Sequence, residues 1–175
     1  MKIISFPELR QTFEYDCGAN ALQSVLSFYG IDVREEILIK QIGTNKSGSS
    51  IKNIGKTAGK YGLKTKAGKM TVEDIKKYIN KKIPVILLLQ AWSKTETDYK
   101  NSWSNGHFVV AIGYDENRLY FEDPYSILRT YLTWEELLDR WHDKSIGNKE
   151  KLINMGIAIY GKKGLYDIKN IVHMD

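Results

Sequence analysis

The first half of the chain spaces its apolar residues as on the buried face of amphipathic helices. The clearest segment begins after Asp16, which can cap the first turn, and ends at Gly30. Its apolar residues follow the i, i+3, i+4, i+7 rule: Leu22, Val25, Leu26 and Tyr29. The same spacing predicts three further helices over about 32–42, 50–61 and 71–80.

The second half changes to short apolar runs that are typical of strands. The run over 84–89 is continuous and suits a strand buried on both faces. Residues 108–114 and 118–122 flank a polar turn and predict an antiparallel hairpin. Two more strands are expected over about 127–132 and 155–160.

A capping box, Thr133-Trp134-Glu135-Glu136, predicts a short helix within this second half. We expect four of its residues to face inward: Trp134, Leu137, Leu138 and Trp141. Helices followed by strands indicate an α+β fold, with a helical part over about 14–80 packed on an antiparallel sheet over about 83–160. Since no repeat, low-complexity tract or proline-rich linker divides the chain, residues 1–175 are expected to form a single domain.

Length and composition fit one soluble globular domain of 175 residues, of which 42% are hydrophobic and 27% charged. The single cysteine cannot form an internal disulfide, and it excludes a cysteine-rich zinc site and favours a reducing compartment. No apolar run approaches the roughly twenty residues of a membrane span, and the first residues do not form a secretory signal. We therefore expect a cytoplasmic protein.

Positive charge is concentrated in residues 40–82, which hold twelve lysines and two acidic residues within a chain of net charge +5. Such a segment could attract an acidic peptide, an anionic membrane surface or nucleic acid. However, Lys52, Lys56 and Lys60 recur every four residues opposite an apolar stripe, as on the solvated face of a helix, and this is the interpretation we prefer. Only five of the 26 basic residues are arginine and there is no nucleic-acid motif, so no nucleic-acid partner is expected.

Cys17 directly follows the expected helix cap, so its sulfur is expected at a helix N-terminus. Unpaired N–H groups and the helix dipole favour a thiolate at such a position. A free cysteine is also commonly an inert core residue, and for Cys17 alone that alternative stays open. The small residues Gly18, Ala19 and Ala21 would either let a substrate backbone approach the sulfur or allow close helix packing.

His107 follows a glycine at the start of an apolar strand, a position from which an imidazole can project into a cleft. The other two histidines lie elsewhere, His142 at the end of the last predicted helix and His173 in the C-terminal tail. Asp123 ends the second strand of the predicted hairpin and precedes Pro124. An antiparallel hairpin brings its outer ends together, so His107 and Asp123 should be neighbours. Taken singly, they would equally suit a surface histidine and a turn aspartate.

Cys17, His107 and Asp123 can together form a thiolate, an imidazole that accepts and returns a proton, and a carboxylate that holds the imidazole tautomer. Chemistry at a peptide carbonyl also needs an oxyanion hole. Gln11 lies six residues before Cys17, near enough for its amide to join the Cys17 backbone N–H in binding a developing oxyanion. This chemistry requires no metal and no organic cofactor.

The segment 11–22, QTFEYDCGANAL, resembles the nucleophile segment of the bacteriocin-processing cysteine peptidases, a papain-like family that trims double-glycine leader peptides. The blocks GHFVVAIGYD at 106–115 and LYFEDP at 119–124 resemble that family's histidine and aspartate motifs in order and spacing. The block TWEELLDRW at 133–141 is similar to the helix that follows them. The resemblance covers about residues 6–141.

This resemblance implies a papain-like fold, with a helical lobe that carries the cysteine against a sheet that carries the histidine and aspartate. It also implies Gln11 as oxyanion donor, Cys17 as nucleophile, His107 as base and then acid, and Asp123 as the residue that orients the imidazole. Many members of the family are domains of export ATPases. This sequence has neither a membrane span nor a G-x-x-x-x-G-K-[ST] nucleotide loop, so we expect a stand-alone peptidase.

The function expected from these observations is hydrolysis of a peptide or protein substrate through an acyl-enzyme intermediate, with a transporter or an acidic protein only as a transient partner. Two alternatives remain open, a peptide-binding domain that does not cut and a cysteine acyltransferase on the same fold. The loop over 90–106 carries Trp92, Tyr99 and Trp103, and it either shapes the cleft or packs its aromatic side chains beneath the loop.

Overall fold

Five helices form in residues 1–174, the part of the chain that the computed structural model describes. Four of them follow the predicted order in the first half of the chain: α1 (Cys17–Phe28), α2 (Glu35–Ile42), α3 (Ile51–Lys60) and α4 (Val72–Asn80). Helix α1 is buried along nearly its whole length, and Leu22, Val25 and Leu26 are fully enclosed. The apolar spacing therefore predicted both the position of α1 and its buried face.

Asp16 stands at the N-cap position of α1, but its side chain does not cap the helix as expected. Its carboxylate instead accepts the backbone N–H of Phe13 at 3.0 Å, in the loop before the helix. The physical reason is the backbone of Asp16, which has φ −102° and ψ 14° rather than the extended conformation from which N-cap side chains reach forward. The carboxylate therefore fixes the preceding loop.

The lysines of α3 confirm the interpretation of that helix as half solvated. Lys52, Lys56 and Lys60 are exposed, while Ile54 and Ala58 on the opposite face are completely buried. This part of the lysine-rich segment is thus the solvent-exposed face of an amphipathic helix.

Within the described residues, seven antiparallel strands form the main sheet in the order β2-β9-β3-β4-β5-β6, with β1 paired to β4. Their bounds are β1 Lys2–Ile3, β2 Lys64–Lys69, β3 Val85–Gln90, β4 Gly106–Tyr114, β5 Arg118–Glu122, β6 Thr130–Thr133 and β9 Met155–Tyr160. Strand β3 lies between β9 and β4 and is buried throughout, as its continuous apolar run predicted. A separate hairpin consists of β7 (His142–Lys144) and β8 (Lys151–Ile153).

Some of these strands depart from the sequence analysis. Strand β2 was not expected, because KTKAGK is a largely exposed edge strand without an apolar face, and it lies within the stretch expected to be helical. The strand expected over 127–132 begins only at Thr130, because Ile127 and Leu128 belong to an exposed turn. His142 is the first residue of β7 rather than the end of a helix.

The predicted capping box forms at the start of α5 (Trp134–Arg140). The Thr133 hydroxyl accepts the Glu136 N–H at 3.2 Å, and the Glu136 carboxylate accepts the Thr133 N–H at 2.8 Å. Leu137 is buried as expected, but the expectation for Leu138 was wrong, since this side chain is 58% exposed. A helix of two turns offers one narrow face to the sheet, and Leu138 is rotated away from it.

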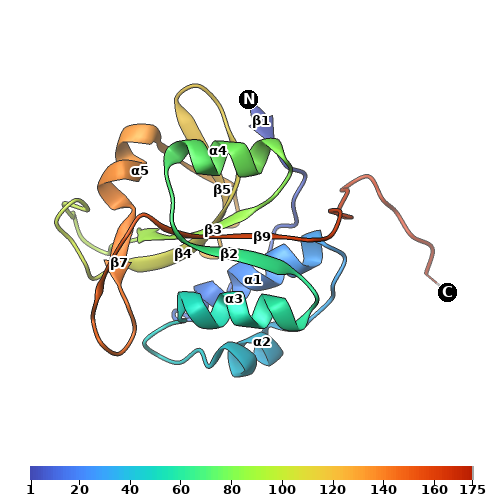
Figure 1. The fold of residues 1–175 in the computed structure, drawn as a ribbon, viewed down its shortest axis with the longest axis horizontal. Helices are drawn as coiled ribbons and strands as arrows, with labels where there is room; N and C mark the ends of the chain where they lie inside the picture. Colours follow the sequence, from blue (N-terminus) through green and yellow to red (C-terminus); the bar gives the residue numbers. More distant parts are fainter. Residues whose placement is uncertain (175) are drawn as a thin grey trace.

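The helices form a layer on each face of the sheet (Figure 1). Helices α1, α2 and α3 lie together on one face, and α4 and α5 lie on the other. Helix α1 packs on β4, so the start of the most buried helix lies over the strand that carries His107. None of the helices within residues 1–174 combines the length and the apolar character needed to cross a lipid bilayer.

Gly18 allows the first turn of α1 to approach the segment before α3 closely. A Cβ atom at this position would lie 2.6 Å from the Cβ of Ser49 and 3.0 Å from a methyl group of Ile54. Of the two uses considered for small residues here, close packing is the one that the structure gives to Gly18.

We expect Gly18→Ala to lower the free energy of unfolding by about 1–3 kcal/mol, because the added methyl group overpacks this contact. Gly59→Ala is the matched control, since Gly59 also lies in a helix and a Cβ there meets no atom within 4 Å. It should raise stability by roughly 0.5–1 kcal/mol through its helix propensity. Denaturant unfolding measures both changes, and equal effects of the two variants would contradict the packing argument.

Candidate active site

Three separate elements bring Cys17, His107 and Asp123 together. Cys17 is the first residue of α1, His107 is the second residue of β4, and Asp123 directly follows β5. Strands β4 and β5 pair as the predicted hairpin, with Val110 opposite Glu122, so Asp123 lies beside the outer end of β4. The expectation that His107 and Asp123 are neighbours agrees with this register.

The His107 ring and the Asp123 carboxylate form a buried hydrogen bond of 2.7 Å between Nε2 and Oδ1. Only 7% of His107 and 3% of Asp123 are exposed. Burial alone would raise the pKa of Asp123, but the hydrogen bond and charge of His107 outweigh it, with help from the Tyr125 N–H and the Thr130 hydroxyl, and hold that pKa below its ordinary value. Asp123 is therefore an ionised carboxylate that accepts a hydrogen bond from the imidazole.

Cys17 contributes to the pKa of the same imidazole. Burial by itself would lower the pKa of His107, but hydrogen bonds to Asp123 and Cys17 and the charges of both partners raise it to about 9. Because Asp123 occupies Nε2, the ring nitrogen that remains for Cys17 is Nδ1. The imidazole is thus bonded to the carboxylate at Nε2 and has Nδ1 left for the thiol, which also raises its pKa.

Gly106, the residue before His107, lies where there is no room for a side chain. A Cβ atom at Gly106 would lie only 2.0 Å from an oxygen of Asp143 in β7. The Asp143 carboxylate accepts a hydrogen bond of 3.0 Å from the buried side chain of Gln90, which also donates to the His142 carbonyl. The start of β4 is therefore packed directly against the β7–β8 hairpin.

Gln11 lies in the loop before α1 and is tied to the chain just beyond Asp123. Its backbone N–H donates to the Pro124 carbonyl at 2.9 Å, and its side-chain Nε2 donates to the Phe13 carbonyl at 2.5 Å. The second Nε2 hydrogen is not used by that bond. The side-chain oxygen is buried and has no partner among the described residues. The amide is thus held by its own loop, with one donor left over.

Two buried carboxylates fix this loop, and the sequence analysis assigned neither of them to the site. Asp16 accepts the Phe13 N–H, and Glu35 at the start of α2 accepts the Thr12 hydroxyl at 2.5 Å. Burial raises the pKa of both carboxyl groups above their ordinary values, although their hydrogen bonds oppose the shift. No sequence signal distinguishes Glu35, because an acidic residue in a first helical turn is ordinary.

The other residues that the sequence did not reveal surround Asp123. The Trp92 indole N–H and the Thr130 hydroxyl each donate to Oδ2 at 3.1 Å. The Tyr125 N–H donates to Oδ1 at 3.0 Å. The aromatic content of the loop over 90–106 was noticed, but only the fold shows which of its rings reaches the carboxylate.

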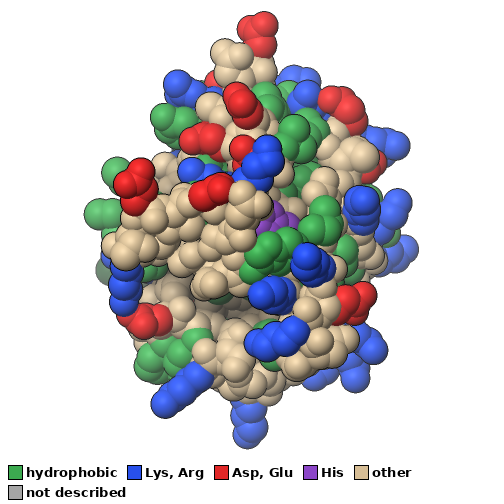
Figure 2. Space-filling model, turned by 90° about the vertical axis from the view of Figure 1, so that its left-hand side faces the viewer, with side chains coloured by type: hydrophobic (Ala, Val, Ile, Leu, Met, Phe, Trp, Pro, Cys, Tyr) green, Lys and Arg blue, Asp and Glu red, His purple; other side chains and the backbone are tan. Residues whose placement is uncertain are grey.

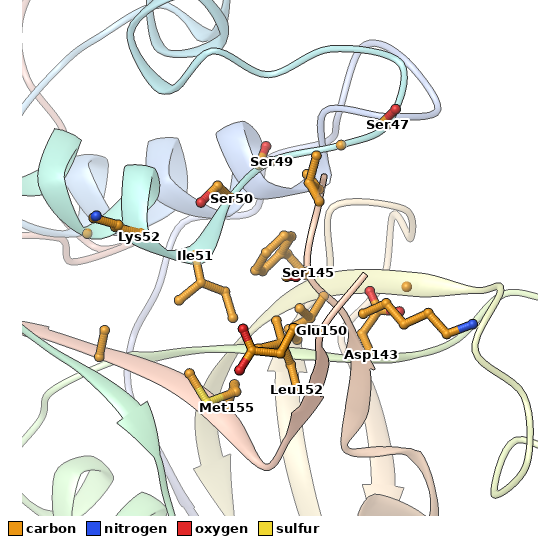
Figure 3. Close-up of a pocket in the computed structure, with 18 of the residues that line it drawn as sticks. Ser47, Ser49, Ser50, Ile51, Lys52, Asp143, Ser145, Glu150, Leu152 and Met155 are labelled. Carbon is orange, nitrogen blue, oxygen red and sulfur yellow. The ribbon is translucent and has the colours of Figure 1, made fainter. Parts of the chain in front are cut away.

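A cleft of about 690 Å³ opens beside Cys17, between the start of α3 and the β7–β8 hairpin. Figure 2 shows a hollowed face with Lys and Arg side chains along one side of the hollow. The apolar part of the cleft comes from both layers, and Figure 3 shows Ile51 facing Leu152 and Met155 across it. Its charged part contains three lysines and two acids: Lys52, Lys56, Lys144, Asp143 and Glu150. Such a cleft has room for a segment of extended peptide.

The helical layer that carries Cys17 packs on the antiparallel sheet that carries His107, and this α+β arrangement is the papain-like fold. Residues 5–151 match the sequence profile of the Peptidase C39 family. The chain belongs to this family of cysteine peptidases, which confirms the resemblance found in the sequence.

Solved structures of the same fold include three peptidases. A putative C39-like peptidase from Bacillus anthracis is 20% identical, with a TM-score of 0.69 over 94% of this chain and 100% of that one. The peptidase domain of Streptococcus ComA, a bifunctional ABC transporter involved in a quorum-sensing pathway, is 22% identical, with a TM-score of 0.65 over 88% and 97%. The double-glycine-motif protease of an AMS/PCAT transporter, solved with the leader peptide, is 22% identical, with a TM-score of 0.64 over 90% and 93%. No curated protein matches the sequence.

The environment of His107 makes the stability of the folded protein depend on pH in a defined direction. Its pKa is raised from 6.5 to about 9, so the folded protein holds the imidazole proton more tightly than the unfolded chain does. The stability from this group is complete below about pH 6.5 and is lost as the pH rises through about 9. We expect an NMR titration of the His107 ring nitrogens to give a midpoint near 9.

The midpoint should fall in Cys17→Ala and in Asp123→Asn, because each variant removes one of the groups that raise it. Asp167→Asn, in the exposed tail, is the matched control and should leave it unchanged. A wild-type midpoint at or below 6.5 would show that burial prevails over the two partners.

Proposed function

We propose that the chain is a cysteine peptidase that hydrolyses peptide bonds with Cys17, His107, Asp123 and Gln11. The observation that carries this proposal is the buried bond of 2.7 Å between His107 and Asp123, on an imidazole whose pKa Cys17 also raises. Burying a polar pair is costly unless it is fully hydrogen-bonded, and an inert core would not need it. The position of the cleft beside Cys17 supplies the place for a substrate.

In the proposed reaction the Cys17 thiolate attacks the carbonyl carbon of the scissile peptide bond. The negative charge that develops on the carbonyl oxygen is bound by the Cys17 backbone N–H and the free Nε2 hydrogen of Gln11. His107 donates its Nδ1 proton to the leaving nitrogen, so the C–N bond breaks and a thioester remains. His107 then takes a proton from water, the hydroxide attacks the thioester, and the C–S bond breaks to release the acid and the thiolate.

The substrate that we propose is a peptide or protein segment lying in the cleft, and residues 1–175 would act as one peptidase domain. The printed descriptions of similar structures support this choice, since two of them are peptidases of transporters and one was solved with its leader peptide. The apolar cleft suits apolar side chains, and Lys52, Lys56 and Lys144 suit acidic ones. A transporter or an acidic protein is therefore the partner that we propose for a transient contact. A free catalytic thiol also favours a reducing location such as the cytoplasm.

Covalent labelling tests the nucleophile. We expect a peptide aldehyde or chloromethyl ketone ending in two glycines to inactivate the protein, and the chloromethyl ketone to add one equivalent at Cys17, as read by mass spectrometry. Cys17→Ala should take up no label, and His107→Ala should label much more slowly, because the imidazole no longer maintains the thiolate. Equal labelling of the wild type and His107→Ala would identify Cys17 as an ordinary reactive thiol.

Turnover tests the oxyanion donor and separates the two alternatives. Gln11→Ala should lower kcat on the order of a hundred-fold, because one oxyanion donor is lost. A wild-type protein that binds a peptide but does not cleave it would favour a binding domain. A product that gains an added amine in place of water, detected by its mass, would favour an acyltransferase.

A further inference from the structure

Trp92 has a backbone conformation that a bulky residue rarely adopts. It lies two residues after the end of β3, with φ +57°, in the left-handed region. The residues on both sides of it are fixed, since the Ala91 N–H donates to the Asn105 carbonyl at 2.9 Å and the Ser93 N–H donates to the Tyr99 hydroxyl at 3.0 Å. A strained residue held from both sides indicates that its side chain is required at one particular place.

The Trp92 side chain is held at Oδ2 of the Asp123 carboxylate. The indole Nε1–H of Trp92 donates to Oδ2 at 3.1 Å, on the side of the carboxylate that His107 does not use. The Trp92 ring also packs against Tyr125, with 4.9 Å between ring centroids, and the backbone N–H of Tyr125 donates to Oδ1. Trp92 thus contacts Asp123 directly and also packs on the residue that holds its other oxygen.

The four bonds to Asp123 fix the rotation of the carboxylate. Oδ1 accepts from His107 and from the Tyr125 N–H, and Oδ2 accepts from Trp92 and from the Thr130 hydroxyl. If Oδ2 lost its donors, the group could turn about its Cβ–Cγ bond, and Oδ1 would no longer be held in line with the imidazole. The orientation of His107 therefore depends on groups that do not touch it.

Trp92 also limits the access of water to this carboxylate. A second cavity of about 430 Å³ is lined by Trp92, Asp123, Thr130 and Tyr131. Trp92 itself is 45% exposed, whereas Asp123 beneath it is only 3% exposed. Replacing the ring by a small side chain would widen this cavity over Asp123 and let water compete for the bonds of its carboxylate.

We infer that Trp92 is a positioning residue of the peptidase: its indole N–H locks the Asp123 carboxylate toward His107, and its ring covers that carboxylate from solvent. The inference rests on the proposed function for its effect on turnover. Its effect on the His107–Asp123 pair does not depend on any activity.

The test compares Trp92→Phe, which removes the N–H and keeps an aromatic ring, with Trp103→Phe as the matched control. Trp103 lies in the same loop, and its ring packs on His142 at 4.3 Å, away from Asp123. We expect Trp92→Phe to lower kcat about ten-fold, as for the loss of one hydrogen bond to a charged group, with little change in KM. Trp103→Phe should leave both constants unchanged.

A double-mutant cycle separates positioning from a general loss of stability. In the Asp123→Ala background, Trp92→Phe should cause no further fall in kcat, because the group that it positions is already absent. If the ten-fold fall persists in that background, or if folded Trp92→Phe keeps the kcat of the wild type, Trp92 does not act through Asp123.

NMR gives a readout that requires no turnover, and its first part requires no variant. In the wild type, the indole N–H resonance of Trp92 should shift with pH at the same midpoint as the His107 ring, since both groups bond the same carboxylate. In Trp92→Phe, the His107 Nε2 proton should exchange faster with solvent. A wild-type protein that shows these signals but cleaves no peptide would refute the proposed function and leave the placement of Trp92 intact. A Trp92 resonance that does not follow His107 would refute the placement itself.

Discussion

The buried hydrogen bond between His107 and Asp123 is the constraint that organises the site. A histidine and a carboxylate taken out of water lose their hydration, and the loss is recovered only if every lone pair and proton finds a partner. The chain meets this demand from distant segments. The β4–β5 hairpin supplies the two residues, the loop after β3 supplies the indole N–H, and the start of β6 supplies a hydroxyl. The first turn of α1 then brings a thiol near enough to raise the pKa of the same imidazole.

The segment that carries Gln11 is fastened at both ends by buried acids. On one side, Glu122 accepts the Leu9 N–H at 2.7 Å and pairs with Arg129, whose guanidinium also donates to the Phe6 carbonyl. Burial raises the pKa of Glu122 to about 7, although the Leu9 bond and the Arg129 charge oppose the shift. On the other side, Glu35 accepts the Thr12 hydroxyl. A loop without helix or strand pairing thus has a defined position, which a group that binds a transient charge requires.

The sequence predicted those parts of the fold that have strong local signals. The spacing of α1, the continuous apolar run of β3 and the β4–β5 hairpin each follow from a short stretch of chain, and together they are sufficient to bring Cys17, His107 and Asp123 near one another. The exposed edge strand β2 and the side-chain orientation of Asp16 could not be predicted, because pairing with β9 and the path of the preceding loop decide them. The same holds for Trp92, Thr130 and Glu35, whose partners lie 23 to 31 residues away or across a turn. Such partners are set by the packing of complete elements.

The backbone bond from the Gln11 N–H to the Pro124 carbonyl joins the loop before α1 to the sheet within one residue of Asp123. The two layers therefore cannot hinge apart along this side without displacing the glutamine and the carboxylate together. Among residues 1–174, no backbone hydrogen bond joins the two sides at the opposite rim, where the cleft is bordered by a serine-rich segment over 47–50 and by the β7–β8 hairpin. Widening the cleft at that rim would therefore break fewer backbone hydrogen bonds than widening it beside the reacting groups.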